Sequence, residues 1–383
     1  MRIRHFFGQK SDCEEAESIH ELPQLKKIAD EWNMLAKQFN TPLLLSEWFV
    51  ACAETLHAKD QLSVLTIRSN GKLSAIAPMV MSKKGGVKYL ELLGSSALRE
   101  PSGFIYSGEN PLRRLICSLL DKRRPIILRR LDAESLQPRL LGQLCRGRAF
   151  CLFRQAANSL YFEIDPDWKG FDESILRRRL KRLHRKERVA ERNGKVDYEV
   201  ISPTMKQLNR YLQELFKVEH ASWKGRNGTS ILSQPEMEQF LLLYSQAAVP
   251  EDKLRLFFMR IDKEAVAARL AVLHANRLWE IKIGYDERFS KCSPGLLLTH
   301  ETIRYAFEQG LDAYEFLGDE EAWEHLWTEH IHPYVTVHIY PYSVSGIIAI
   351  GTDILRLIWK KAIRSLGALF GLMKNLSVRM KKR

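Results

Sequence analysis

Ser293, Pro294 and Gly295 separate a run of residues typical of a strand from a run typical of a helix. Proline fits the first turn of a helix, where its missing N–H costs nothing, and glycine lets the backbone approach a ligand closely. We expect a helix that begins here to leave the N–H groups of Gly295, Leu296 and Leu297 unpaired by the chain. Because such a terminus carries partial positive charge, the segment predicts a site for a pyrophosphate or a carboxylate. A plain strand-to-helix turn is the alternative, since Pro and Gly occur in most loops.

The segments around this turn follow a regular order of helices and strands. The pattern predicts a basic helix, a strand, two helices, a three-stranded meander, the helix that follows Pro294, and two further strands, at about 171–193, 196–201, 203–247, 254–286, 295–309, 313–317 and 333–340. This order describes a mixed sheet in which a helix leaves the end of the third meander strand. The turn then lies at the end of a strand, where a ligand has access.

The first half of the chain repeats this plan in outline. Residues 62–94 predict three strands joined by turns at Asn70-Gly71 and Gly85-Gly86, as in the meander of the second half. A chain of 383 residues also exceeds the size at which a single core stops growing. We therefore expect an α/β protein of two tandem units, at 1–165 and 166–345, followed by a helical tail at 346–383. The first unit has no Pro-Gly helix start after Leu93-Gly94, so we expect the second unit to bind the cofactor.

Four short segments of the second half stand in a distinctive order: His220 and Trp223 before Gly228 and Ser230, Tyr285-Asp286, Ser293-Pro294-Gly295, and residues 316–320 (FLGDE) before Trp327. In order and spacing this half resembles the Gcn5-related N-acetyltransferase superfamily. Within it, the double-domain Fem-type peptidyl transferases and the CelD-like, BioF-type proteins of bacterial polysaccharide clusters are the most similar group. The resemblance covers about 170–342. It implies two tandem acetyltransferase-type domains with mixed sheets.

The resemblance also implies transfer of an acyl group from acyl-coenzyme A, with acetyl-coenzyme A as the first expectation, to an amine or hydroxyl of an envelope or polysaccharide acceptor. Such a transfer needs a base near the acceptor and a donor for the leaving thiolate. The candidate bases are Asp319, Glu219, His220 and Glu315, and Tyr285 is the candidate donor. The expected cofactor-binding residues are Ser293, Gly295, Leu296 and Leu297, and the expected acceptor-binding residues are Trp223, Lys224 and Trp327. No metal is expected.

Each candidate also has a structural interpretation. Glu219 and His220 fit the exposed charged face of a helix, and Glu315 fits a buried polar network. Tyr285 fits packing at a sheet edge, and the two tryptophans fit a core or a pocket wall. One departure from the family's pattern adds to this. Relatives carry a Tyr-Lys pair ahead of the last tryptophan, where this chain has Trp323 and Glu324.

Two segments hold most of the positive charge. The formal net charge is +13, but nine Arg or Lys residues lie within 174–192 against two glutamates, and nine lie within 353–383 against Asp353. The first segment predicts a helix that could bind RNA, contact an anionic polysaccharide or membrane, or remain solvated. We favour a structural or membrane-adjacent role over tRNA binding. The second predicts a basic amphipathic helix that could lie on an anionic membrane or pack on its own domain.

The six cysteines show no paired C-x-x-C spacing, and no secretory signal precedes them, so neither a zinc ribbon nor a disulfide framework is expected. No window of 18 uninterrupted apolar residues predicts a spanning helix. We expect a cytoplasmic protein, peripheral on the inner face of the membrane if the tail binds it. An acyl-coenzyme A-dependent acyltransferase is the first hypothesis. An aminoacyl-tRNA-dependent peptidyl transferase and a non-catalytic accessory protein of polysaccharide assembly are the alternatives.

Overall fold

The second half of the chain is built around a seven-stranded mixed sheet. A computed structural model describes residues 14–164, 179–356 and 358–359. The strands of this sheet lie in the order β11 (Val196–Ile201), β12 (Leu254–Ile261), β13 (Glu264–His274), β14 (Arg277–Tyr285), β15 (Ala313–Glu315), β10 (Ser159–Glu163) and β16 (Ile331–His332). The strands β12 to β14 form the predicted meander. The basic helix expected from residue 171 is described only from Arg179, as α7 (Arg179–Glu191); its first part lies outside the described residues.

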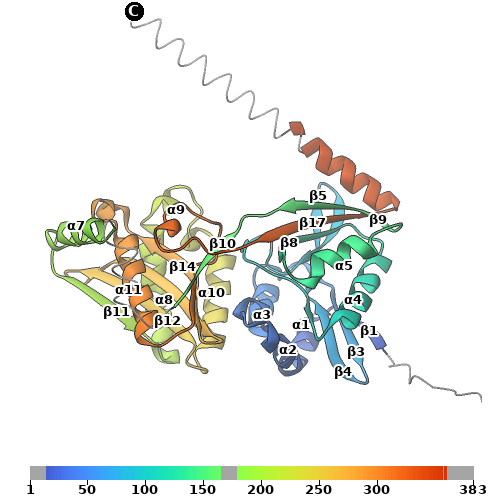
Figure 1. The fold of residues 1–383 in the computed structure, drawn as a ribbon, viewed down its shortest axis with the longest axis horizontal. Helices are drawn as coiled ribbons and strands as arrows, with labels where there is room; N and C mark the ends of the chain where they lie inside the picture. The colour runs from blue at the N-terminus through green and yellow to red at the C-terminus, as the bar shows by residue number, and fades with distance from the viewer. Residues whose placement is uncertain (1–13, 165–178, 357, 360–383) are drawn as a thin grey trace, which may run out of the picture.

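Helices cover both faces of this sheet (Figure 1). One face packs against α8 (Met205–His220) and α10 (Pro235–Ala248), with the short α9 (Trp223–Arg226) between them. The other face packs against α11 (Pro294–Glu308) and α7. The apolar side chains of α8 recur at helical spacing, so that Leu208, Leu212 and Leu215 are all buried against the sheet.

The first half contains two sheets. One has the order β1 (Glu14–Ile19), β3 (Val64–Ser69), β4 (Lys72–Ala77), β7 (Ile105–Tyr106); the other has the order β2 (Gln61–Leu62), β5 (Met79–Lys84), β6 (Val87–Leu92), β8 (Ile126–Asp132), β17 (Tyr334–Pro341), β9 (Ala149–Gln155). Its helices are α1 (Leu22–Lys27), α2 (Ala29–Ala36), α3 (Ser46–Glu54), α4 (Glu109–Asp121) and α5 (Leu136–Leu144).

The expectation of three strands over 62–94 was wrong in one respect. The middle strand divides at Pro78, which has no N–H to donate to a ladder, and its two parts enter different sheets.

The two halves exchange strands. Strand β10 comes from the first half, yet it pairs with β15 and β16 in the sheet of the second half. Strand β17, which the sequence placed in the sheet of the second half, pairs instead with β8 and β9 of the first. The chain passes between the halves at the centre of the molecule, just before β10 and just before β17 (Figure 1). A hydrophobic core joins the halves as well, where Trp48 packs edge-on against Phe240 and Tyr244.

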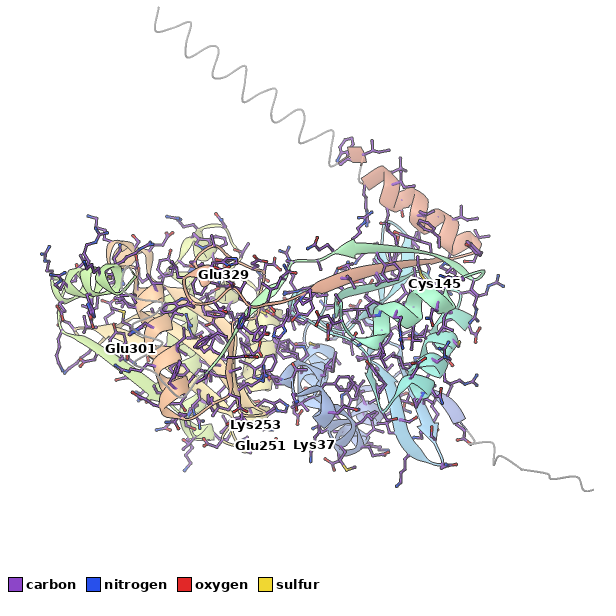
Figure 2. All side chains as sticks on the ribbon, in the orientation of Figure 1. Lys37, Cys145, Glu251, Lys253, Glu301 and Glu329 are labelled. Atoms are coloured by element: carbon purple, nitrogen blue, oxygen red, sulfur yellow. A yellow bond between two sulfur atoms is a disulfide. The ribbon has the colours of Figure 1, made fainter. Side chains whose placement is uncertain are left out.

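Two features complete the first half. Cys145, at the end of α5 (Figure 2), forms a disulfide with Cys151 on β9, a pairing that the cysteine spacing did not predict. After β17, residues 344–356 and 358–359 are helical, and this C-terminal helix lies on the face of the six-stranded sheet opposite to α4 and α5 (Figure 1). Among the described residues, no helix combines the length and the apolar character needed to cross a bilayer.

Candidate functional site

A cleft of about 490 Å³ opens in the second half, between β14, the start of α11 and residues 316–326. It exists because β14 and β15 separate. The two strands pair in parallel only from Arg277–Ala313 to Trp279–Glu315, whereas β14 continues to Tyr285 alongside β13. Beyond Trp279, one edge of β14 therefore has no partner among the described strands. A strand edge of this kind offers N–H and C=O groups to an extended ligand.

The start of α11 borders the cleft. Ser293 is the N-cap residue, with a left-handed backbone (φ 53°), and its carbonyl accepts hydrogen bonds from Leu296 N at 3.0 Å and Leu297 N at 3.2 Å. The expectation that these two N–H groups are unpaired was therefore wrong, because the carbonyl of an N-cap residue already accepts the first bonds of the helix. The Gly295 N–H has no acceptor among the described residues. Ser293, Gly295 and Leu296 line the cleft, while Leu297 is buried in the core.

Tyr285 lies against this helix start. A Cβ atom built on Gly295 would be 3.4 Å from the Tyr285 ring, so the ring and the backbone of Gly295 are in contact. Tyr285 lines the cleft, and its hydroxyl makes no hydrogen bond within the part of the chain that the structure describes. The hydroxyl is therefore free to donate to a ligand.

Asp319 lies at the mouth of the cleft, with 53% of its side chain exposed. The turn before it has positive φ at Leu317 (55°) and Gly318 (64°). Two residues of the first half hold this turn: Glu100 accepts a hydrogen bond from Gly318 N at 3.0 Å, and Arg130 donates to Gly318 O at 2.6 Å. Arg130 also lies 3.5 Å from the Asp319 carboxylate. The first half thus positions the turn, although the cleft belongs to the second half.

The residues around α9 divide between the cleft and its surroundings. Trp223 and Lys224 line the cleft, and Trp223 is 47% exposed. Glu219 is buried behind them, where it accepts a hydrogen bond from Ile231 N at 2.9 Å and lies 3.4 Å from the Lys224 ammonium. His220 is exposed, bonds to Ser230 Oγ at 2.8 Å, and does not line the cleft.

Glu315 and Trp327 lie away from the cleft. Glu315 is buried, and its two oxygens contact Arg277 Nη1 at 2.6 Å and His332 Nε2 at 3.0 Å. It faces a second cavity of about 300 Å³ between the two halves. Trp327 is buried in the core between α11 and the sheet. The structure therefore places Asp319, Tyr285, Trp223 and Lys224 together and keeps these two residues apart from them.

Glu324 lines the cleft, and the sequence did not identify it as a candidate. Its side chain is 4% exposed, and burial raises its pKa to about 8, with the nearby carboxylates of Glu280 and Glu321 acting in the same direction. One carboxylate oxygen accepts the Glu321 N–H at 3.2 Å, and the other has no hydrogen-bond partner among the described residues. A carboxyl group with a pKa near 8 can exchange a proton with a ligand close to neutral pH. The sequence did mark this position, because Glu324 departs from the Tyr-Lys pair of the family that the sequence resembles.

A buried network supports the floor of the cleft. Arg269 pairs with Glu280, and both bond to the Tyr314 hydroxyl. Arg269 also donates to Thr299 Oγ1 at 2.8 Å, which ties the sheet to α11. Because each of these side chains already has partners, the network fixes the strands around the cleft rather than offering a free reactive group.

Lys282 and Glu100 also line the cleft. Burial lowers the pKa of Lys282, and the charge of Glu100 opposes that shift. Burial likewise raises the pKa of Glu100, against the effect of Lys282. Within the described residues, no group of His, Cys, Asp and Glu side chains is arranged to bind a metal ion.

Comparisons with known proteins agree with this geometry. Residues 177–325 match the acetyltransferase (GNAT) domain family, and no curated protein sequence matches the chain. Three solved structures share the fold. The C-terminal domain (DUF2156) of a putative lysylphosphatidylglycerol synthetase from Agrobacterium fabrum is 9% identical, with a TM-score of 0.52, over 86% of this chain and 97% of that one. A conserved protein of unknown function from Bacteroides thetaiotaomicron is 11% identical (TM-score 0.52; 85% and 98% covered), and FemX is 13% identical (TM-score 0.51; 85% and 97% covered). The predicted fold of two tandem acetyltransferase-type domains is confirmed.

Proposed function

We propose, from the match of residues 177–325 to the acetyltransferase (GNAT) domain family, that the chain transfers an acyl group from acyl-coenzyme A to an amine or a hydroxyl. The observation that carries this proposal is the unpaired edge of β14 beside the start of α11, inside one cleft. Acetyl-coenzyme A is the first candidate donor. The acceptor, in this proposal, belongs to the cell envelope or its polysaccharides, as the resemblance of the sequence implies.

The cleft fits acyl-coenzyme A in two respects. The unpaired edge of β14 supplies N–H and C=O groups for the amides of an extended pantetheine arm. The start of α11 supplies the free Gly295 N–H and the positive end of a helix dipole for a pyrophosphate, and the exposed Arg182 of α7 lines the same cleft. The cofactor would bring the thioester whose acyl group is transferred. Of the four residues first expected to hold it, Leu297 no longer qualifies, because its N–H is bonded and its side chain is buried.

The side chains of the cleft suit the proton transfers of such a reaction. We assign the general base to Glu324, whose unpartnered oxygen would accept a proton from the acceptor amine or hydroxyl once the carboxyl is ionised. The free hydroxyl of Tyr285 would donate to the leaving thiolate. Asp319 is the alternative base, since it lies at the mouth of the cleft. Trp223 and Lys224 would contact the acceptor.

One observation favours a second candidate function. The described part of α7 exposes Lys181, Arg182 and Arg185, and Arg182 lines the cleft. A row of cations beside the site would suit the phosphates of an aminoacyl-tRNA donor. A salt-sensitive complex between the full chain and tRNA would support this candidate, and binding of coenzyme A without tRNA binding would eliminate it.

Calorimetry with the full chain tests the first proposal. Coenzyme A and acetyl-coenzyme A are titrated separately, and quenching of tryptophan fluorescence gives a second readout because Trp223 and Trp323 line the cleft. Absence of binding at millimolar concentrations of both ligands would overturn the proposal. Release of the free thiol in the presence of amine and hydroxyl acceptors then tests transfer itself and separates an enzyme from a non-catalytic accessory protein.

A matched pair of variants at one position tests the role of the helix start. Gly295→Pro removes the free N–H at the second helical position, and Gly295→Ala keeps the N–H while adding only an ordinary contact with Tyr285. Because a proline here also disfavours helical backbone at Pro294, urea unfolding of both variants checks that the fold is retained. We expect the proline variant to bind coenzyme A about tenfold more weakly, because a hydrogen bond to a charged group contributes about 1.5–3 kcal/mol. The alanine variant should bind within about twofold of the wild type. If the two variants bind coenzyme A equally well, the Gly295 N–H does not contact the cofactor.

A further inference from the structure

The C-terminal helix is attached to the first half by one of its faces. Ala349 is fully buried, and together with Ile350 it packs against a cluster on the outer face of the six-stranded sheet that includes Tyr89 and Tyr340. Tyr340 donates a hydrogen bond to the Asp353 carboxylate at 2.8 Å. These contacts fix the orientation of the helix, and therefore the direction in which its other side chains point.

The opposite face of the helix is apolar and open to solvent. Seven large apolar residues, called here the exposed stripe, recur at helical spacing with exposures of 50% to 75%: Val344, Ile347, Ile348, Ile354, Leu355, Ile358 and Trp359. Single exposed apolar residues are common on proteins, but a contiguous patch marks an interaction site. In Figure 1 no other element of the described chain covers this side of the helix.

The charges around the exposed stripe are positive. The sequence of residues 353–383 contains nine Arg and Lys residues and a single acid, Asp353, and of the nine the structure describes Arg356. The Asp353 carboxylate accepts a hydrogen bond from Tyr340. Arg356, within the described part of the helix, is exposed, and its guanidinium lies beside Gly85, between β5 and β6. Arg123 donates a hydrogen bond to Tyr342 O at 3.2 Å, immediately before the helix. Arg123 and Arg356 thus lie beside the helix that carries the exposed stripe, in a segment whose sequence is basic.

We propose that the exposed stripe docks on the surface of an anionic lipid bilayer. An amphipathic helix with Trp, Ile and Leu on one face and basic residues beside it binds in the interface plane of a membrane. Apolar burial and attraction to anionic headgroups both contribute, and each basic residue near the surface adds to the second term. Contacts with Tyr89 and Tyr340 hold the other face of the helix on the sheet, so the helix would lie between the bilayer and the six-stranded sheet.

Co-sedimentation with vesicles tests the proposal. The full chain is mixed with vesicles of phosphatidylcholine alone or with one third phosphatidylglycerol, at low and high salt. We expect binding to the anionic vesicles that weakens as salt is raised. Failure of the wild-type chain to sediment with anionic vesicles at low salt would overturn the proposal, as would equal binding to neutral vesicles at high salt.

Two triple variants test the exposed stripe itself. The stripe variant carries Ile347→Gln, Leu355→Gln and Ile358→Gln; the control carries Met34→Gln, Val200→Gln and Met205→Gln, which alter apolar residues that are also exposed but lie elsewhere on the molecule. Because all six side chains are on the surface, both variants should fold. We expect the stripe variant to lose at least about tenfold in vesicle affinity, since three inserted apolar side chains are removed, and the control to match the wild type.

Self-association is the competing explanation for the exposed stripe. Sedimentation velocity without lipid distinguishes the two explanations. If the wild type is a dimer and the stripe variant is a monomer, the exposed stripe binds a second copy of the chain, and the membrane proposal is overturned. Equal vesicle binding by the stripe variant and the wild type would also overturn the proposal. Coenzyme A binding in the cleft is measured on the same preparations, so that failure of the membrane proposal and failure of the proposed function are told apart.

Discussion

Replacing Glu324 with glutamine should change how the stability of the protein depends on pH. The Glu324 carboxyl is 4% exposed, and its pKa is raised from 4.5 to about 8. A raised pKa means that the folded state favours the neutral carboxyl. The stability that the neutral carboxyl provides is complete below pH 4.5 and is lost as the pH rises through 8. Glutamine is neutral at every pH and therefore does not lose it.

The size of the effect follows from the two pKa values. Each pH unit between 4.5 and 8 costs the wild-type folded state about 1.4 kcal/mol relative to the unfolded chain. The free energy of unfolding of Glu324→Gln should therefore exceed that of the wild type by about 1 kcal/mol at pH 5, about 3 kcal/mol at pH 7 and nearly 5 kcal/mol above pH 9. A glutamate with an ordinary pKa would give no such trend.

Urea unfolding at pH 5, 7 and 8.5 measures these differences. Glu134→Gln is the matched control, because Glu134 is an exposed glutamate of the first half and its replacement should shift stability by less than about 0.5 kcal/mol at each pH. If the two unfolding curves of wild type and Glu324→Gln keep the same separation at all three values of pH, Glu324 is not a neutral buried carboxyl, and the assignment of the base is withdrawn. In acyl transfer, kcat/KM should rise with pH through about 8, and Glu324→Gln should lose that rise together with about 10²–10⁴ of the rate.

Three further changes probe the scaffold of the cleft. Gly284→Ala would place a Cβ atom 2.6 Å from the Cα of Glu219, so chemical denaturation should show a loss of about 1–3 kcal/mol. Arg130→Met removes the hydrogen bond to Gly318 O and should cost about 1.5–3 kcal/mol while weakening coenzyme A binding in calorimetry; unchanged binding would show that the turn does not need this contact. Glu315→Gln should lower the melting temperature but leave the pH profile of kcat/KM unchanged, because both carboxylate oxygens contact other side chains of the protein. A shifted profile would make Glu315 a candidate base again.

Much of the second half could be predicted because its signals are local. The turns at residues 262–263 and 276–277 divide the meander, and the structure has β12, β13 and β14 on either side of them. Pro294 predicted the first turn of α11, which the structure has from Pro294 to Glu308. Hydrophobic periodicity and turn residues act over a few positions, so a single sequence is enough to read them.

What could not be predicted depends on packing between distant segments. The sequence of β17 does not indicate which sheet the strand joins. Strands that are close in sequence usually pair, but β17 pairs with the distant strands β8 and β9. Glu324 was visible as a departure from the family's pattern, but its burial, and hence its raised pKa, depends on how residues 316–326 lie over the sheet. Arg130 and Glu100 reach the cleft from the first half, and no spacing in the sequence relates them to Gly318.

The contacts between the two halves limit how the molecule can move. Many two-domain enzymes admit substrate by rotating one domain away from the other about a flexible joint. Here such a rotation would have to open the shared core in which Trp48 packs against Phe240 and Tyr244. It would also break the hydrogen bonds that join Glu100 and Arg130 to Gly318. We therefore expect substrates to reach the cleft through rearrangement of loops and side chains at its mouth, while the two sheets keep their relative position.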